Sequence, residues 1–359
     1  MSGWMRRVLT AGRTVEDGFD RLRFEVRRRT GRLSSMEILP YRGHGNDREL
    51  FLKGRVLETL GLPSPNAEDS RRRNLRSMAR RFLSSEVPKA RVRALYAGQE
   101  IEAKADKEGY FDLRFSLAEP LEGDASWRRV RIELVWPHAG GESQATGKVL
   151  VPTRARFGVI SDLDDTVLQS NVTNFLKMAR VVLLGNAHTR LPFEGVAAFY
   201  RALQRGASGG EFNPIFYVSS SPWNLYDLLE DFMDLHGVPA GPLFLRDWSP
   251  TALKGGAEHK LRVIRMLLAT YPELPFVLIG DSGERDPEIY QKIVLEYPGR
   301  IRAVYIRDVT GKERDKVVHE IARRLRNLGV EMLLVPNTVA AVDHAADQGL
   351  ISSGLRFGA

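Results

Sequence analysis

The chain has 359 residues, 43% of them hydrophobic and 27% charged, a composition typical of globular proteins and long enough for about two domains. The absence of cysteine excludes disulfide frameworks, zinc ribbons, iron–sulfur sites and thiol nucleophiles, and it fits a cytoplasmic protein. The formal net charge of +8 favours anionic partners, and no apolar run reaches the ~18 residues of a membrane-spanning helix.

Residues 1–35 form a basic segment in which nine arginines outnumber four acidic residues. Apolar side chains recur at helical spacing in this segment, at Val15, Phe19, Leu22 and Val26. This spacing predicts a basic amphipathic helix. The helix either docks on its own domain or lies on an anionic membrane surface, which would make the protein peripheral on the inner face of a membrane.

Residues 36–154 have a pattern that predicts a small antiparallel, β-sandwich-like domain. Four runs separated by turns largely alternate apolar with polar residues, at 50–57, 90–95, 109–115 and 130–136. A helical insert near 69–84 interrupts them and carries six arginines with no acidic residue between them. Such a cluster is either a solvated helix face or an anion-binding patch.

Residues 155–335 alternate short apolar runs with segments of helical periodicity. The apolar runs are 157–160, 214–218, 242–245, 275–279 and 302–306. This alternation predicts an α/β domain with a doubly wound parallel sheet. Residues 336–359 are expected to form one short helix and a tail.

Polar residues follow three of these strands, at the edge where open α/β sheets bind ligands. The acids of this edge are Asp162, Asp164, Asp281 and Asp286, and Ser219 follows a third strand. Carboxylates that converge without a cation would repel one another, and a hard divalent cation removes that conflict. Because the ligands are oxygens with no cysteine or histidine cluster beside them, we expect Mg²⁺ rather than Zn²⁺.

The same residue types suit phosphoryl transfer. A metal at this edge neutralises charge on the phosphate, while Ser219 and Lys260 can bind the other phosphate oxygens. An ionised aspartate beside the metal is a candidate nucleophile that gives an aspartyl-phosphate. A second aspartate two residues later can protonate the leaving alkoxide and then deprotonate water.

The joint pattern resembles the haloacid dehalogenase superfamily of aspartate-nucleophile phosphotransferases. Over about residues 155–335 it resembles more closely the catalytic domain of the phosphatidate phosphatases typified by the fungal actin-patch enzyme. The matching runs are Ser-Asp-Leu-Asp-Asp-Thr from residue 161, Val-Ser-Ser-Ser-Pro-Trp-Asn-Leu-Tyr from 218, Glu-His-Lys from 258 and Gly-Asp-Ser-Gly-Glu-Arg-Asp-Pro-Glu-Ile-Tyr from 280. The resemblance implies a haloacid-dehalogenase-like domain with a small cap at about 169–191, and a Mg²⁺-dependent conversion of phosphatidate to diacylglycerol.

The resemblance also implies the site residues. The catalytic residues are Asp162, Asp164, Thr166, Ser219 and Lys260. The metal ligands are Asp162, Asp164, Asp281 and Asp286. Asp162 matches the nucleophile and Asp164 the general acid/base, while Ser219, with Ser220 as the register alternative, matches the hydroxyl of the second motif.

Two other functions stay open. One is a phosphatase for a soluble or polymeric phosphate, such as a nucleotide, a nucleic-acid end or a phosphoprotein, although no aromatic signature of nucleic-acid binding accompanies the arginines. The other is a non-catalytic protein that binds lipid or a partner, against which the complete set of acids counts. The apolar residues of the cap either meet acyl chains or pack on the sheet domain.

Overall fold

The structure, a computed structural model, describes residues 35–58, 85–124, 126–137, 143–163, 195–247 and 256–354. These residues form two compact units, one from 35–43, 49–118 and 128–149, the other from 44–48, 119–127 and 150–354. The predicted N-terminal helix, arginine-rich insert and cap lie outside the described residues. The domain limits expected from the sequence remain predictions.

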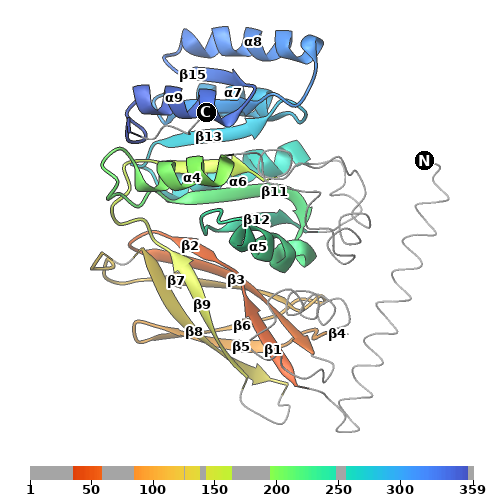
Figure 1. Cartoon of the computed structure of the whole chain (residues 1–359). Coiled ribbons are helices and arrows are strands. Elements are labelled where there is room, and N and C mark those ends of the chain that lie inside the picture. Colours follow the sequence, from red (N-terminus) through yellow and green to blue (C-terminus); the bar gives the residue numbers. More distant parts are fainter. Residues whose placement is uncertain are drawn as a thin grey trace, which may run out of the picture. The chain divides into compact units, whose positions relative to one another are not determined.

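An antiparallel sheet of nine strands accounts for the secondary structure of the described residues between 36 and 150 (Figure 1). The strands are β1 (Met36–Pro40), β2 (Gly43–Gly45), β3 (Glu49–Glu58), β4 (Ser85–Glu86), β5 (Arg91–Tyr96), β6 (Gln99–Lys104), β7 (Tyr110–Ser116), β8 (Trp127–Trp136) and β9 (Gln144–Leu150). Strand β3 pairs antiparallel with β1, β4 and β7, and β5 pairs antiparallel with β6 and β8. The predicted antiparallel sheet is therefore confirmed.

The alternation seen in the sequence corresponds to one buried face of this sheet. Along β3, every second residue from Leu50 to Val56 is buried, whereas Phe51, Lys53 and Arg55 between them are partly exposed. Successive side chains of a strand point to opposite faces, so an alternating pattern produces a single apolar face. Gly54 lies where β3 passes the Phe111 ring, which would stand 2.4 Å from a Cβ atom at this position.

A parallel sheet of six strands organises the second unit. Its strands are β10 (Gly158–Asp162), β11 (Ile215–Pro222), β12 (Leu243–Arg246), β13 (Phe276–Asp281), β14 (Ile301–Arg307) and β15 (Glu331–Val335). They lie in the order β12–β11–β10–β13–β14–β15, with every neighbouring pair parallel. The predicted parallel sheet is confirmed, and β15 is a strand that the sequence analysis did not identify.

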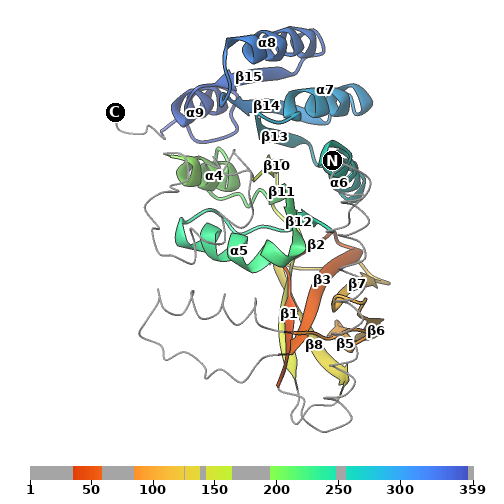
Figure 2. The ribbon, with the colours of Figure 1, turned by 90° about the vertical axis from the view of Figure 1, so that its right-hand side faces the viewer.

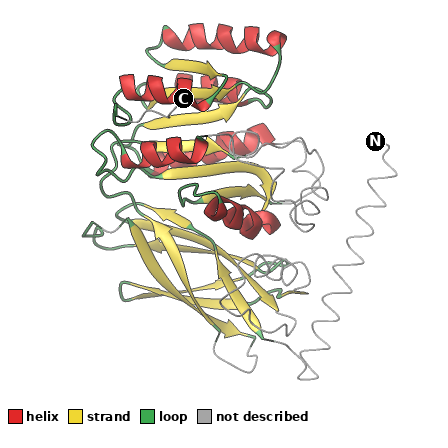
Figure 3. Ribbon diagram, viewed as in Figure 1, coloured by secondary structure: helices red, strands yellow, loops and turns green. Residues whose placement is uncertain are grey.

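Helices cover both faces of the parallel sheet. They are α4 (Val196–Arg205), the 3-10 helix η1 (Trp223–Leu225), α5 (Tyr226–Leu235), α6 (Gly256–Thr270), α7 (Asp286–Glu296), α8 (Lys312–Arg326) and α9 (Thr338–Asp347). Figure 2 shows α4 and α9 on one face and α6 and α7 on the other. Figure 3 shows that, within the described ranges, every α-helix belongs to this second unit. None of the helices in these ranges is long and apolar enough to cross a bilayer.

The core of the second unit fixes the helix that carries Lys260. All residues of β10 and β13 are buried, as expected for strands covered on both faces. In α6, Ile264 and Leu267 belong to the same buried cluster as Phe216 and Leu278 of the sheet. Burial of a side chain of this size stabilises the fold by about 1.5–3 kcal/mol, so this packing holds α6 in a defined position.

Candidate active site

The candidate site lies where the strand order reverses. Counted along the chain, the strands of the parallel sheet follow the order 3-2-1-4-5-6, and the reversal falls between β10 and β13. Asp162 is the last residue of β10, and Asp281 is the last residue of β13. Connections leave such a sheet in opposite directions at the reversal, and open α/β sheets bind their ligands at the carboxyl ends of the strands at this point.

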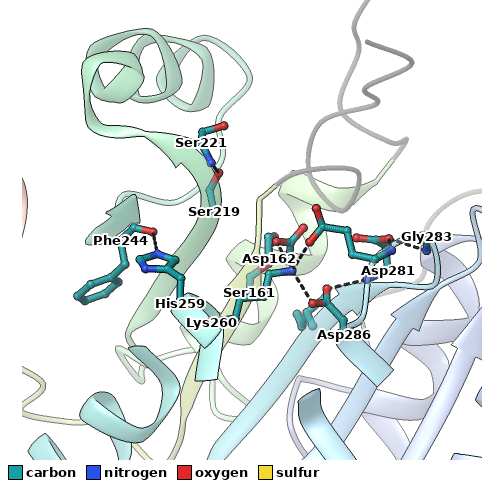
Figure 4. A network of polar contacts seen from close by, with 12 residues as sticks. Ser161, Asp162, Ser219, Ser221, Phe244, His259, Lys260, Asp281, Gly283 and Asp286 are labelled. Carbon is teal, nitrogen blue, oxygen red and sulfur yellow. Dashed lines mark hydrogen bonds and ion pairs between the residues drawn. The ribbon is translucent and has the colours of Figure 1, made fainter. Parts of the chain in front are cut away.

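Asp286 joins the two strand-end aspartates from the first residue of α7 (Figure 4). Its Oδ2 atom accepts a hydrogen bond from the backbone N–H of Asp281 at 3.2 Å. Gly280 permits this approach, because a Cβ atom there would stand 2.3 Å from the same Oδ2. Asp162, Asp281 and Asp286 are all buried, and each offers one oxygen within 4.8 Å of the others.

Lys260, in the first turns of α6, is the cation of this cluster. Its Nζ lies 2.7 Å from Asp162 Oδ1 and also contacts Asp286 Oδ1. A third carboxylate reaches the same ammonium from the loop after β13, with Glu284 Oε2 at 2.8 Å. Lys260 is only 2% exposed, and its contacts with the buried Asp162 and Asp286 take place away from water. One ammonium thus contacts three carboxyl side chains.

The charges in the site shift the pKa values of its members. Burial, followed by the neighbouring Asp286, raises the pKa of Asp281 to about 7. Burial also raises the pKa of Asp286, although Lys260 opposes this shift. Burial alone would lower the pKa of Lys260, but Asp162 and Asp286 outweigh it and hold that pKa well above its ordinary value. Lys260 therefore stays charged, while Asp281 titrates near neutrality.

A divalent cation fits the oxygens that remain. Asp281 Oδ1 accepts hydrogen bonds from the N–H groups of Gly283 at 2.7 Å and Glu284 at 2.8 Å. Asp281 Oδ2 is buried and, within the described part of the chain, has no hydrogen-bond partner. A buried carboxylate oxygen without a partner is costly unless a cation binds it. Three carboxylates within reach of one another are the oxygen ligands that Mg²⁺ prefers.

The structure thus brings together four of the residues predicted from the sequence: Asp162, Lys260, Asp281 and Asp286. Ser219 is buried in β11, the strand on the other side of β10 from β13, and its Oγ accepts a hydrogen bond from the N–H of Ser221 at 2.9 Å. Asp164 and Thr166 lie outside the described residues, so their predicted roles stay predictions.

Two contacts of the site were missed by the sequence analysis. Glu284 was not among the predicted site residues, yet it pairs with Lys260. Ser161 Oγ donates to the carbonyl oxygen of Asp162 at 2.7 Å and lies 2.7 Å from the Tyr200 hydroxyl of α4. Because a serine hydroxyl has one proton, Tyr200 is then the donor to Ser161. No local pattern in the sequence signals this link between α4 and the end of β10.

The segment of the chain that contains this site matches the model of a known protein family. Residues 157–308 match the family model described as "Phosphatidate phosphatase APP1, catalytic domain". Phosphatidate phosphatase APP1 of Saccharomyces cerevisiae is 33% identical over 179 residues, which are 48% of this chain and 30% of that protein. The resemblance to the phosphatidate phosphatase catalytic domain is therefore confirmed over residues 157–308, the segment that contains the site.

The other similarities are weaker. An uncharacterised protein of Schizosaccharomyces pombe is 29% identical over 167 residues, which are 45% of this chain and 27% of that protein. The chain thus spans less than a third of the length of either yeast relative. Among solved structures, a carbohydrate acetylesterase from Xanthomonas citri is 15% identical over 79% of this chain and 72% of that chain. Its TM-score of 0.28 is too low to carry an argument.

Proposed function

We propose that this protein is a Mg²⁺-dependent phosphatase that hydrolyses a lipid phosphomonoester, with phosphatidate as the substrate and diacylglycerol as a product. The observation that carries the proposal is the buried cluster of Asp162, Asp281 and Asp286 around Lys260. The similarity of residues 157–308 to a phosphatidate phosphatase catalytic domain supports a phosphoric monoester hydrolase, and the name of that relative supports phosphatidate.

The aspartates of the cluster are the ligands we propose for the metal. Asp162, Asp281 and Asp286 would hold Mg²⁺, with Asp164 as the further ligand expected from the sequence. When bound, Mg²⁺ would neutralise negative charge on the phosphate that is transferred. The buried Oδ2 of Asp281 supports this assignment, since among the described residues it has no hydrogen-bond partner.

Asp162 is the proposed nucleophile. Its carboxylate oxygen attacks the phosphorus and forms an aspartyl-phosphate, while the bond between the phosphorus and the lipid oxygen breaks. Asp164 donates a proton to the leaving lipid alkoxide. Asp164 then accepts a proton from water, whose oxygen attacks the same phosphorus. Inorganic phosphate leaves and the Asp162 carboxylate is restored.

Lys260 and Ser219 support these steps in the proposed mechanism. Lys260 pairs with Asp162 at 2.7 Å, which favours the ionised carboxylate that must act as nucleophile. Its ammonium also offsets part of the negative charge that the carboxylates and the phosphate bring together. Ser219 and Thr166 would donate hydroxyl hydrogen bonds to the phosphate.

The finer predictions from the sequence belong to the same proposal. The reversed strand order and the acids at the strand ends support a haloacid-dehalogenase-like domain, with a cap at about 169–191. The excess of arginine in residues 1–35 supports binding to an anionic membrane surface from the cytoplasmic side.

Phosphate release from a lipid substrate and from a soluble phosphate ester tests the proposal. The full-length protein is assayed with phosphatidate in mixed micelles and with a soluble aryl phosphate, in Mg²⁺ and in EDTA. We expect Mg²⁺-dependent release that strongly favours phosphatidate. Asp162→Asn should abolish this release, while the exposed Asp347→Asn should behave as the wild type.

Each other outcome changes a different part of the proposal. Release from the aryl phosphate alone would keep the reaction and redirect the substrate to soluble or polymeric phosphates. Equal rates in EDTA and Mg²⁺ would refute the metal dependence. Substantial activity of the folded Asp162→Asn variant would refute the nucleophile.

A further inference from the structure

The loop between β13 and α7 supplies three of the carboxylates in the candidate site. Asp281 ends β13, Glu284 lies in the loop and Asp286 begins α7. A loop places ligands accurately only if its backbone is held in one conformation. The contacts that hold this loop come from the far side, from the start of α8.

Arg314 of α8 makes the contacts that fasten the loop backbone. Its Nε donates to the carbonyl oxygen of Ser282 at 3.0 Å, and its Nη2 donates to the carbonyl oxygen of Glu284 at 2.8 Å. The two carbonyls flank Gly283. A planar guanidinium presents its N–H donors in a rigid fork, so it fixes the distance and direction between two acceptors at once.

The bond from Arg314 to Ser282 acts directly on Asp281. The Ser282 carbonyl and the Gly283 N–H belong to the same planar, trans peptide group, so they point in opposite directions. Arg314 holds the carbonyl end of this group, and the N–H end donates to Asp281 Oδ1 at 2.7 Å. A cation on the carbonyl also polarises the peptide and strengthens the hydrogen bond at its other end.

Arg314 is itself held in place. Glu288, in the first turn of α7, accepts from Nη1 at 2.5 Å and from Nη2 at 2.8 Å. Ser282 is tied from the same side, because its Oγ accepts from the N–H of Val309 at 3.0 Å and lies 2.7 Å from Thr310 Oγ1. The loop is therefore held by Arg314 of α8, which Glu288 of α7 fixes in turn, and by the residues just before α8.

We infer that Arg314 is a positioning residue for the metal site. It orients the Ser282–Gly283 peptide so that the Gly283 N–H donates a hydrogen bond to Asp281 Oδ1. This leaves Asp281 Oδ2 directed at the cation. This inference rests on the proposed metal dependence and extends it to a residue that contacts neither the metal nor the substrate. Its loss weakens Mg²⁺ binding, because partners that orient a ligand typically contribute about 10- to 100-fold to metal affinity.

The chain offers a matched control in Arg265 of α6. Arg265 also makes a bidentate pair with a glutamate of α7, donating from Nε and Nη2 to Glu296 at 2.9 and 2.8 Å. The Arg265 side chain is 37% exposed, and the Arg314 side chain is 26% exposed. Loss of Arg265 therefore removes an interhelical ion pair of similar kind without touching the loop.

Mg²⁺ binding to the metal-free, full-length protein tests the inference by isothermal titration calorimetry. Arg314→Ala should weaken binding by about 10- to 100-fold, and Arg265→Ala should leave it unchanged. Arg314→Lys keeps the charge but lacks the fork, so its affinity should fall between those of the wild type and Arg314→Ala. Melting temperatures show that each variant is folded, and the lysine variant provides the test if the alanine variant is not.

Hydrogen exchange provides a second measurement that needs no metal. The amides of Gly283 and Glu284, which donate to Asp281, should exchange faster in Arg314→Lys than in the wild type and in Arg265→Ala. Unchanged Mg²⁺ affinity in both Arg314 variants would overturn the inference, as would equal weakening by Arg265→Ala. A wild-type protein that binds no Mg²⁺ would refute the proposed metal dependence itself, and the positioning role with it.

Discussion

Mg²⁺ binding should weaken as the pH falls below 7, because protons compete with the metal for Asp281. Burial and the nearby Asp286 raise the pKa of this carboxyl to about 7. Asp281 would bind the cation through its ionised carboxylate, so a proton on Asp281 has to leave before the cation binds. At pH 8 about one-tenth of Asp281 is protonated, and at pH 6 about nine-tenths.

These fractions set the size of the effect. The apparent dissociation constant for Mg²⁺ should be about tenfold larger at pH 6 than at pH 8. Binding at pH 6 should release close to one proton per metal ion, and binding at pH 8 about a tenth of one. Asp286, whose pKa is also raised by burial, would make the dependence steeper.

The assay is calorimetry of the metal-free protein in two buffers that differ in their enthalpy of ionisation, at pH 6 and at pH 8. The difference in heat between the buffers gives the number of protons released. Asp281→Asn cannot titrate at this position, so it should bind weakly and lose this component of the pH dependence. A dissociation constant that is the same at both pH values, with no proton release, would refute the assignment of Asp281 as a ligand with a raised pKa.

Three further predictions follow from other parts of the chain. Lys260→Met should lower the free energy of unfolding of the metal-free protein by about 3–5 kcal/mol, because it leaves buried carboxylates without their cation; an unchanged urea midpoint would contradict this. Ser219→Ala should lower kcat/KM by about 10- to 100-fold through the loss of a hydrogen bond to a charged phosphate, and wild-type kinetics would remove Ser219 from the site. Deletion of residues 1–30 should reduce sedimentation with anionic liposomes at low salt, whereas equal sedimentation would favour docking of this segment on its own domain.

The sequence predicted the two sheets because their patterns are local. Alternation along β3 and β7 marked an antiparallel sheet with one buried face, and the continuous apolar runs of β10 and β13 marked strands buried on both faces. Strand β15 escaped notice although four of its five residues are apolar, because a short apolar run without alternation does not by itself distinguish a strand from a buried helix segment.

The acids at the strand ends were also readable from the sequence. Asp162 and Asp281 each follow an apolar run after one small residue, and parallel strands bring their carboxyl ends to one edge. That argument places residues at an edge of the sheet, but it does not say which side chains touch. The strand order decided that β10 and β13 are neighbours and that Ser219 stands on the opposite side of Asp162.

Only the tertiary structure determined how the charges of the site are arranged. Lys260 pairs with Glu284 across 24 positions of the chain, and the Arg314 guanidinium reaches the Ser282 carbonyl across 32. Such contacts depend on how α6 and α8 pack beside the loop after β13. The period of a hydrophobic pattern records which face of an element is buried, because burial acts on each element by itself. The partner of a buried charge is set by the packing of several elements together, and the sequence of any one of them carries no record of it.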